Sequence, residues 1–382
     1  MTTTPKTAPP GLDPAALAAL QGRHLLLTQD WGAPELETLL ALARRLEAGD
    51  RAGRSQAFLR DQLAYALFFD NSTRTKSAWA GAAARLGMQP VIVDGTSTQV
   101  AHGETAVETG AMLGMNAHAL GIRHDLILGE GHRFMLDVAR GIDEYLAATG
   151  DPRRVPVVNL QCDVDHPTQT LADLLWLRER FPGGLEGRRI AISWAYSPSY
   201  AKPLSVPQGL ITLLTRFGAD VTLAHPEGYD LSAASLAAAR RNAAGSGGAF
   251  RTAGTMDEAF RGADAVYPKS WGPHDLMLER VEANRARDGR RMADIERRAL
   301  ERNGLHRDWI CDERRMGLTA AGEALYLHCL PADIGAEVTA GVLERHRVSL
   351  ARQANKKVYV IMALLAAAKV PELARRLDGA GA

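Results

Sequence analysis

Hydrogen-bonding side chains gather where an apolar segment gives way to a helical one, in the stretch FFDNSTRTK at residues 68–76. Ser72, Thr73 and Thr75 supply hydroxyl groups, and Arg74 supplies a forked cation that suits phosphate. The start of a helix adds unpaired backbone N–H groups and a partial positive charge. The stretch therefore predicts an anion site, although an ordinary Ser or Thr N-cap explains the hydroxyl groups equally well when the stretch is taken alone.

Two further polar clusters follow apolar segments in the same way. QCDVDHPTQ at 161–169 would place His166 and Gln169 in the first turn of a helix. YLHCLPAD at 326–333 is an apolar run stopped by Pro331, which can leave backbone carbonyls free to accept a ligand amide. A histidine before proline is more often structural than catalytic. Ligands in α/β sheets nevertheless bind at strand ends, so several such clusters together favour a functional site.

The elements that must position these clusters are short apolar runs alternating with amphipathic stretches. The runs are rich in Val, Ile, Leu and Ala, which is typical of strands buried on both faces of a parallel sheet. The predicted strands are 64–69, 90–94, 118–122, 155–160, 188–194, 220–225, 264–268 and 324–330. The alternation predicts an α/β protein with two doubly wound parallel sheets of four strands each, joined by residues 166–181.

Composition restricts the class of protein. A chain of 382 residues predicts two domains, and a net charge of +1 favours neither a nucleic-acid nor a membrane partner. No apolar run is long enough to span a bilayer, and residues 1–14 contain no hydrophobic signal core. Cys162, Cys311 and Cys329 are too few and too widely spaced for a disulfide framework or a zinc site. We therefore expect a cytoplasmic protein without a metal.

The motifs STRT, HPTQ and HCLP, in this order and spacing, resemble the aspartate/ornithine carbamoyltransferase family from about residue 20 to residue 370. TQVAHGET at 98–105, WAYSPSYAKPLSVPQG at 194–209 and YPKSW at 267–271 resemble a narrower group within it, the knotted catabolic transcarbamylases. Deep knots are rare, and no sequence pattern predicts one. The resemblance alone implies a deep trefoil knot in the second domain, at the proline-rich loop 194–209.

The resemblance also implies how the chain divides. Residues 1–175 plus 355–382 would form the domain that binds carbamoyl phosphate, and residues 176–354 the domain that binds the amine. Family members form catalytic homotrimers, in which the region of the polar loop 94–104 reaches the neighbouring subunit's site. Residues 274–302 carry both charge signs at helical spacing, which predicts an exposed helix near the rim of the cleft.

The resemblance assigns a binding role to each residue that matches the family's motifs. Three residues would be catalytic: His166 would donate a hydrogen bond to the carbonyl oxygen of carbamoyl phosphate, Arg123 would reach both that oxygen and the phosphate, and Arg74 would hold the phosphate. Gln169 and two backbone carbonyls would hold the carbamoyl amide, so neither a cofactor nor a covalent intermediate is implied. The implied carbamoyl-phosphate ligands are Ser72, Thr73, Arg74, Thr75, Gln99, Arg123, His166, Gln169, Cys329, Leu330 and Lys357.

Two positions depart from the family's common pattern. Lys357 stands where the family commonly has an arginine, and an ammonium is a point charge rather than a fork. Lys269, Ser270 and Trp271 replace the pattern with which ornithine enzymes bind the amino acid. Lys269 would suit a carboxylate, and Trp271 would form a wall of the pocket unless it packs in the core. Free ornithine is therefore not the expected substrate.

The expected activity is transfer of a carbamoyl group between carbamoyl phosphate and the amine of a small carboxylated metabolite. The same site run backwards would cleave a ureido compound with phosphate. One alternative is an N-acetylornithine or N-succinylornithine carbamoyltransferase. A second alternative, from another class, is a non-catalytic subunit or sensor that binds carbamoyl phosphate.

Overall fold

The computed structural model describes residues 12–200 and 202–379. The expected domain ends at 1–11 and 380–382, and Ala201 in the proline-rich loop, lie outside the described residues. Within the described ranges, no helix has the length and apolar character needed to cross a bilayer.

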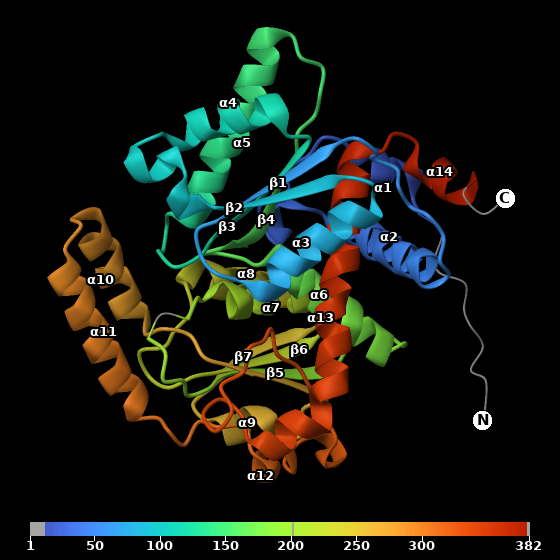
Figure 1. The fold of residues 1–382 in the computed structure, drawn as a ribbon. Helices are drawn as coiled ribbons and strands as arrows, with labels where there is room; N and C mark the ends of the chain where they lie inside the picture. The colour runs from blue at the N-terminus through green and yellow to red at the C-terminus, as the bar shows by residue number, and fades with distance from the viewer. Residues whose placement is uncertain (1–11, 201, 380–382) are drawn as a thin grey trace.

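Four parallel strands in the order β2-β1-β3-β4 form the first sheet, in the upper half of Figure 1. Every residue of β4 is buried, as expected of a strand covered by helices on both faces. The register between β3 and β4 shifts between Ile122 and Arg123. The strands are β1 (Leu63–Phe68), β2 (Gln89–Asp94), β3 (Ala119–His124) and β4 (Val157–Cys162).

The second sheet is also parallel and has five strands, in the order β7-β6-β5-β8-β9. The expectation of four strands was therefore wrong. The missed strand, β7, lies at the sheet edge, and its residues AFRTA are mostly not buried, so it lacks the apolar run that marks the other strands. The strands are β5 (Arg189–Trp194), β6 (Asp220–Ala224), β7 (Ala249–Ala253), β8 (Ala265–Lys269) and β9 (Leu325–Tyr326).

Helices connect the strands and cover the two sheets, so the α/β class with two parallel sheets is confirmed (Figure 1). The helices before β5 are α1 (Pro14–Ala19), α2 (Ala33–Arg51), α3 (Thr73–Arg85), α4 (Ala106–Asn116), α5 (Gly131–Thr149) and α6 (Pro167–Arg180). Those after β5 are α7 (Ser205–Leu214), α8 (Ala233–Ser246), α9 (Met256–Phe260), α10 (His274–Arg285), α11 (Gly289–Gly304), α12 (Glu313–Met316), α13 (Ala340–Lys369) and α14 (Leu373–Gly379).

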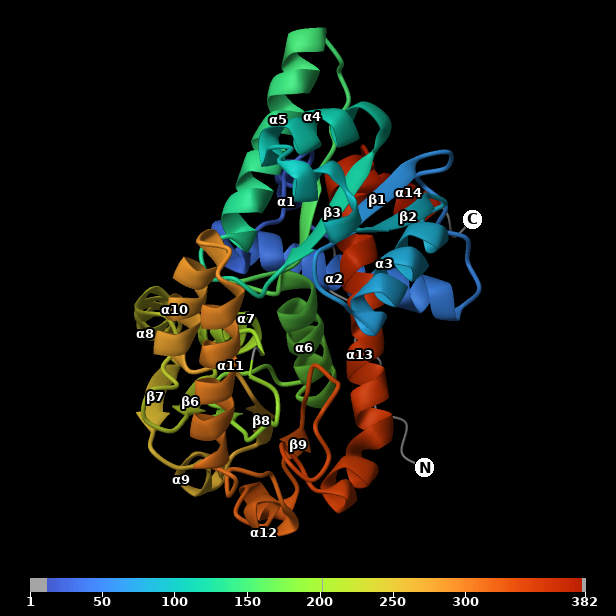
Figure 2. The same cartoon turned by 60° about the vertical axis from the view of Figure 1, so that its left-hand side comes forward.

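The long helix α13 joins the two halves of the molecule. Its first turns lie beside the second sheet, and its remainder runs along the first, where it packs on α2, α3 and α6 (Figure 2). The segment from Tyr359 to Ala368 is continuously buried, because an apolar helix enclosed by others needs no polar face. Since α6 also leads from β4 toward β5, α6 and α13 set the spacing between the sheets.

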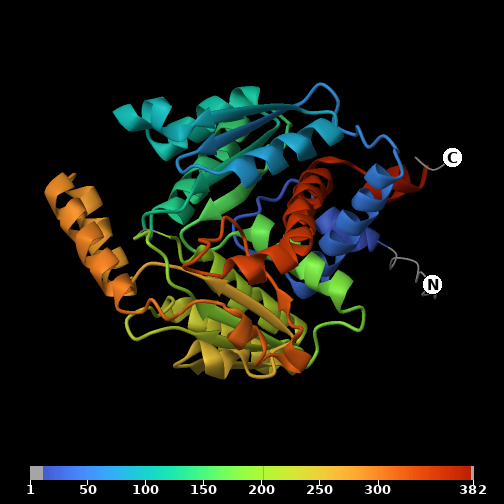
Figure 3. The ribbon, with the colours of Figure 1, turned by 60° about the horizontal axis from the view of Figure 1, so that its bottom comes forward.

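The charged stretch 274–302 forms a helical hairpin rather than one helix. The chain reverses between α10 and α11 at residues 286–288, where Arg287 has a φ of +51°. The pair projects from the side of the second sheet, as Figure 3 shows. Arg280 on α10 is buried and donates from Nη1 to the carbonyl of Leu126 at 3.3 Å. The hairpin therefore contacts the loop that follows β3 of the first sheet.

Candidate active site

The polar clusters at the strand ends meet in one cavity of about 160 Å³. Residues at or just after the ends of β1, β3 and β4 of the first sheet line it together with Lys269 at the end of β8, residues that follow β9 of the second sheet, and Lys357 of α13. Each polar cluster found in the sequence therefore contributes to the same space. The implied carbamoyl-phosphate ligands in the lining are Ser72, Arg74, Thr75, Arg123, His166, Gln169, Cys329, Leu330 and Lys357.

One end of the cavity is the start of α3. Ser72 is the N-cap of this helix, and its Oγ accepts the backbone N–H of Thr75 at 3.1 Å. The first turn carries no acidic residue that would occupy the helix start. Arg74 lines the cavity from the same turn, and burial, together with the nearby charge of Arg123, lowers the pKa of the Arg74 guanidinium. This end is thus suited to an anion.

Arg123 enters the cavity from the end of β3. It donates to both carboxylate oxygens of Asp125, from Nε at 3.2 Å and from Nη2 at 3.0 Å. The shift in strand register comes just before Arg123, and such bulges re-aim side chains beside functional sites. Burial raises the pKa of Asp125 well above its ordinary value, although the Arg123 charge opposes that shift. Arg123 is therefore held in place by its own strand end.

His166 caps α6 opposite the start of α3. Its Nδ1 lies 3.4 Å from Oγ1 of Thr168, and its Nε2 lies 3.5 Å from Nζ of Lys357. Burial, with the neighbouring charges of Lys357 and Arg123, lowers the pKa of His166 well below its ordinary value. The imidazole is thus neutral at pH 7. If Nδ1 accepts from the Thr168 hydroxyl, the ring proton lies on Nε2, where it can be donated to a ligand.

Gln169 is oriented by a buried acid one turn further along α6. Its Nε2 donates to Oδ1 of Asp173 at 2.8 Å. The same carboxylate accepts from Gln353 at 2.6 Å and from the Tyr267 hydroxyl at 3.2 Å. Because the amide nitrogen of Gln169 is used, its oxygen is left to accept a hydrogen bond from a ligand in the cavity. Burial raises the pKa of Asp173 to about 6.

The HCLP stretch bends the chain at Cys329 and Leu330, where it lines the cavity. Leu330 has a φ of +53°, a left-handed conformation that is uncommon outside glycine. His328 stabilises this bend, because its Nδ1 accepts the backbone N–H of Leu330 at 2.8 Å. The following peptide bond, Leu330–Pro331, is cis.

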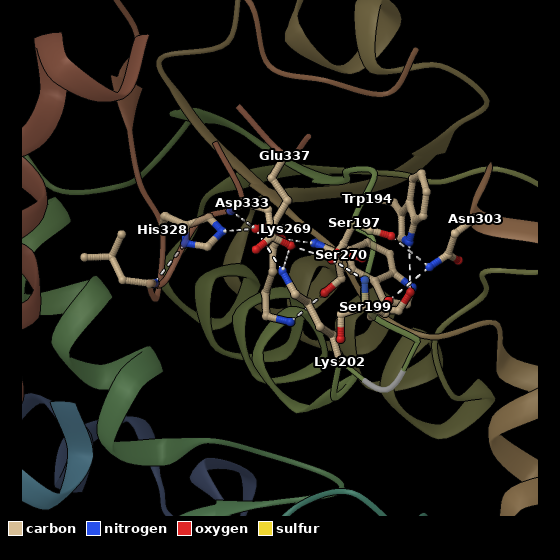
Figure 4. Close-up of polar contacts among 12 residues, drawn as sticks. Trp194, Ser197, Ser199, Lys202, Lys269, Ser270, Asn303, His328, Asp333 and Glu337 are labelled. Carbon is tan, nitrogen blue, oxygen red and sulfur yellow. Dashed lines mark hydrogen bonds and ion pairs between the residues drawn. The ribbon is translucent and has the colours of Figure 1, made fainter. Parts of the chain in front are cut away.

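Lys269 lies at the end of β8 and lines the cavity, whereas its two successors do not. Its ammonium donates to the backbone carbonyls of Ser270 at 2.7 Å and Pro203 at 3.1 Å, and burial lowers its pKa (Figure 4). Trp271 is fully buried, and its Nε1 donates to the carbonyl of Tyr229 at 2.8 Å. Trp271 therefore packs in the core of the second half, and the expectation of a pocket wall is corrected.

Two of the expected carbamoyl-phosphate ligands, Thr73 and Gln99, are exposed and do not line the cavity. Sequence reasoning also missed part of the lining. The signal that could have revealed Lys202 and Glu337 is their charge, because the segments around them are otherwise apolar or loop-like. The missed residues are Asn71, Gln161, Lys202, Pro203, Val206, His328, Pro331 and Glu337. No group of three or more His, Cys, Asp or Glu residues in the described part of the chain is arranged to hold a metal ion.

Comparison with known proteins accounts for both halves. Residues 23–179 match the aspartate/ornithine carbamoyltransferase carbamoyl-P binding domain, and residues 204–368 match the Asp/Orn binding domain of the same family. The chain belongs to this family. It is a carbamoyltransferase, and its relatives by sequence and by structure agree with that assignment.

Among curated relatives, the putative carbamoyltransferase YgeW of Escherichia coli K12 is 47% identical over 358 residues, covering 92% of this carbamoyltransferase and 90% of the relative. The N-acetylornithine carbamoyltransferase of Xylella fastidiosa Temecula1 is 29% identical, covering 90% and 98%.

Two solved structures that it resembles are also carbamoyltransferases. A point mutant of N-acetyl-L-ornithine transcarbamylase complexed with carbamyl phosphate and N-succinyl-L-norvaline superposes with a TM-score of 0.74 at 26% identity, covering 90% of this chain and 99% of that one. Ornithine carbamoyltransferase from Pyrococcus furiosus has a TM-score of 0.73 at 27% identity, covering 91% and 97%.

Proposed function

We propose that this cavity binds carbamoyl phosphate and transfers its carbamoyl group to the amine of a small carboxylated metabolite. The observation that carries the proposal is the pairing of a cationic helix start with a neutral, buried histidine in one small cavity. Phosphate would occupy the start of α3 between Ser72, Thr75 and Arg74, which all line the cavity. Residues 1–175 plus 355–382 would then be the carbamoyl-phosphate domain, and 176–354 the amine domain.

Buried positive charge supports the phosphate position. Burial, with the nearby charges of Arg123 and Arg74, lowers the pKa of Lys357 to about 7. Nζ of Lys357 donates to Oγ1 of Thr75 at 3.2 Å, so its ammonium adjoins the helix start. Removing cations from water is costly unless an anion accompanies them. A bound phosphate dianion would offset that cost and restore the charge of Lys357.

The other end of the cavity fits the carbamoyl group. The amide oxygen of Gln169 and the backbone carbonyls of Cys329 and Leu330 can accept the two amide hydrogens. His166 would donate to the carbonyl oxygen, where negative charge builds in the tetrahedral transition state. The amine lone pair attacks the carbonyl carbon, and the C–O bond to phosphate then breaks with its electron pair on phosphate. The proton lost by the amine goes to a phosphate oxygen.

Lys269 supports a carboxylate on the second substrate. Its ammonium is buried and lines the cavity. Among the hydrogen bonds and ion pairs of the described residues, its only partners are backbone carbonyls. A carboxylate would supply the missing counter-charge. Ser270 contributes through the carbonyl that holds Lys269. Since a catalyst cannot change an equilibrium, the same site also serves phosphorolysis of the ureido product.

The proposal also includes the oligomeric state and the cellular location of the protein. Gln99 is exposed and does not line its own chain's cavity, which agrees with a homotrimer in which the 94–104 loop reaches the neighbour's site. Thr73 would contribute through its backbone N–H at the first position of α3. A knot at loop 194–209, implied by the family resemblance, and a cytoplasmic location, expected from the few cysteines, remain part of the proposal. Gel filtration with light scattering tests the trimer.

A mass-spectrometric screen tests the second substrate. Purified protein and carbamoyl phosphate are mixed with a pool of small amines, half of them carboxylated, with His166→Ala as the inactive control. We expect a carboxylated amine to gain one carbamoyl group only with the intact protein, and Lys269→Met to lose that product. Reaction of uncharged amines alone would overturn the carboxylate assignment.

The same screen separates the alternatives. Carbamoylation of N-acetylornithine or N-succinylornithine in preference to every other amine would replace the proposed substrate with one of these. Binding of carbamoyl phosphate without any product from the pool would favour a sensor or an amine outside the pool, and addition of cell-extract metabolites then distinguishes these two.

A further inference from the structure

Glu337 lines the cavity and is fully buried. Its Oε1 accepts the backbone N–H of Ser270 at 2.7 Å, and its Oε2 accepts the backbone N–H of Asp333 at 2.8 Å. Oε2 also lies 3.0 Å from Nζ of Lys202 and 3.6 Å from Nε2 of His328. Figure 4 shows the carboxylate near the middle of this cluster, with His328 on one side and Ser270 on the other.

Two of these contacts lead to the amine side of the cavity. Ser270 is the residue whose carbonyl accepts from the Lys269 ammonium, so Glu337 fixes the backbone that holds Lys269. Lys202 lines the cavity from the proline-rich loop and is bound by Glu337 and, at 2.7 Å, by Asp333. These carboxylates raise the pKa of Lys202, so it stays charged.

The remaining side-chain contact leads to the carbamoyl side. Nδ1 of His328 accepts the N–H of Leu330, so in the neutral ring the proton lies on Nε2, which faces Glu337. At 3.6 Å this contact is an electrostatic attraction rather than a hydrogen bond, and it favours the ring orientation in which His328 holds Leu330 in its left-handed conformation. The carbonyls of Cys329 and Leu330 are the acceptors proposed for the carbamoyl amide.

The same neighbours keep the Glu337 carboxylate ionised. Burial alone would raise its pKa, but His328, Lys202 and the Ser270 N–H outweigh burial and hold the pKa below its ordinary value. A carboxylate that accepts from this many donors is rigid, because each donor would be left unsatisfied if it moved.

We propose that Glu337 is a positioning residue that sets both halves of the site, the amine half through Lys202 and Ser270 and the carbamoyl half through His328 and Leu330. The inference rests on the proposed function. It predicts that one substitution far from the phosphate disturbs recognition of the carbamoyl group while leaving the phosphate position intact.

The test compares the affinities of carbamoyl phosphate and inorganic phosphate by titration calorimetry. Glu337→Gln keeps the shape but removes the charge. We expect it to weaken carbamoyl phosphate roughly tenfold, the loss typical of a hydrogen bond to a charged group, while phosphate affinity stays unchanged. Asp333→Asn is the matched control, because Asp333 binds Lys202 but not His328 and should leave the ratio of the two affinities unchanged.

Two His328 variants test whether Glu337 acts on Leu330 through His328. They also keep the inference testable if Glu337→Gln fails to fold. His328→Asn retains an acceptor for the Leu330 N–H, and His328→Gln retains a donor toward Glu337. We expect the Gln variant to lower carbamoyl-phosphate affinity as Glu337→Gln does, and the double variant Glu337→Gln/His328→Gln to lose no more than either alone. Once the amine is known, Glu337→Gln should raise the KM of both substrates and Asp333→Asn that of the amine only.

The outcomes separate this inference from the proposed function. If the intact protein binds neither carbamoyl phosphate nor phosphate, the proposed function is wrong and the inference falls with it. If the intact protein binds both, and the Glu337 and His328 variants keep its affinity ratio, only the inference is overturned. Additive losses in the double variant would likewise remove the link between Glu337 and Leu330.

Discussion

Nζ of Lys357 lies 3.5 Å from Nε2 of His166, and both groups are buried in the wall of the cavity. Burial lowers the pKa of each, so neither carries its full charge while the cavity is free of anions. A phosphate group would draw a proton to Lys357 and leave His166 neutral as a hydrogen-bond donor. The positive charge of the pair therefore increases when an anionic ligand binds.

The first prediction is a pH dependence of carbamoyl-phosphate binding. The pKa of Lys357 is about 7 in the free protein, and a bound dianion raises it. A raised pKa in the complex means that the extra affinity is complete below pH 7 and is lost as pH rises from 7 toward the pKa of the complex. We expect affinity to fall by up to about tenfold per pH unit in that window. Calorimetric titration measures the slope.

Lys357→Arg is the control for this pH dependence, because a guanidinium stays charged throughout the range. Its affinity should change little with pH over the same window. A slope shared by the intact protein and the Arg variant would assign the titration to another group.

A second prediction concerns His166 and separates chemistry from binding. His166→Ala removes the ring that would donate to the developing oxyanion and puts no other donor in its place, and removing one such donor lowers kcat by about 10²–10³-fold. Carbamoyl-phosphate affinity should fall much less, since the phosphate contacts are unchanged. Steady-state kinetics on the amine found by the screen, alongside calorimetry, measures both. A large loss of affinity with kcat preserved would make His166 a binding residue.

A third prediction follows from the buried Asp173. Asp173→Leu leaves Gln169, Gln353 and Tyr267 without their acceptor, which should destabilise the fold by about 1–3 kcal/mol. It should also weaken carbamoyl phosphate, because Gln169 is free to rotate. Asp173→Asn can still accept from both glutamines and donate to Tyr267, so it should retain affinity. Urea unfolding and calorimetry test the pair, and equal behaviour of the two variants would refute the orienting role.

A fourth prediction contrasts two neighbouring lysines on α13. Nζ of Lys356 lies 2.7 Å from Oε2 of the buried Glu47 and also pairs with Glu179. Lys356→Met leaves the buried Glu47 carboxylate with Arg51, at 2.6 Å, as its remaining ion-pair partner and should cost about 1–3 kcal/mol of folding stability. Lys357→Met should cost little stability but much carbamoyl-phosphate affinity. If urea unfolding showed a larger loss of stability for Lys357→Met than for Lys356→Met, these two roles would be contradicted.

Much of the fold and site could be predicted because the signals were local. The polar residues after β1 and β4 stood next to buried strands, and the structure brings Ser72, His166 and Lys357 together in one cavity. The edge strand β7 was missed because it has no apolar run.

The remaining site residues depend on contacts between distant segments. Glu337 meets Lys202 only after the proline-rich loop folds over the second sheet, and no local pattern marks that pairing. Asp173 was not singled out because it lies in one of the amphipathic stretches, where a polar residue is expected to face solvent, whereas α6 is buried along most of its length. Trp271 was ambiguous for a similar reason, since an aromatic beside a site residue suits both a pocket and a core.

A crystal structure with carbamoyl phosphate bound tests the central claim most directly. We predict the phosphate at the start of α3, in contact with Ser72, Thr75 and Arg74, and the carbamoyl amide facing the side-chain oxygen of Gln169 and the Leu330 carbonyl. Carbamoyl phosphate bound in the reverse direction or at another surface, with this cavity empty, would contradict the account.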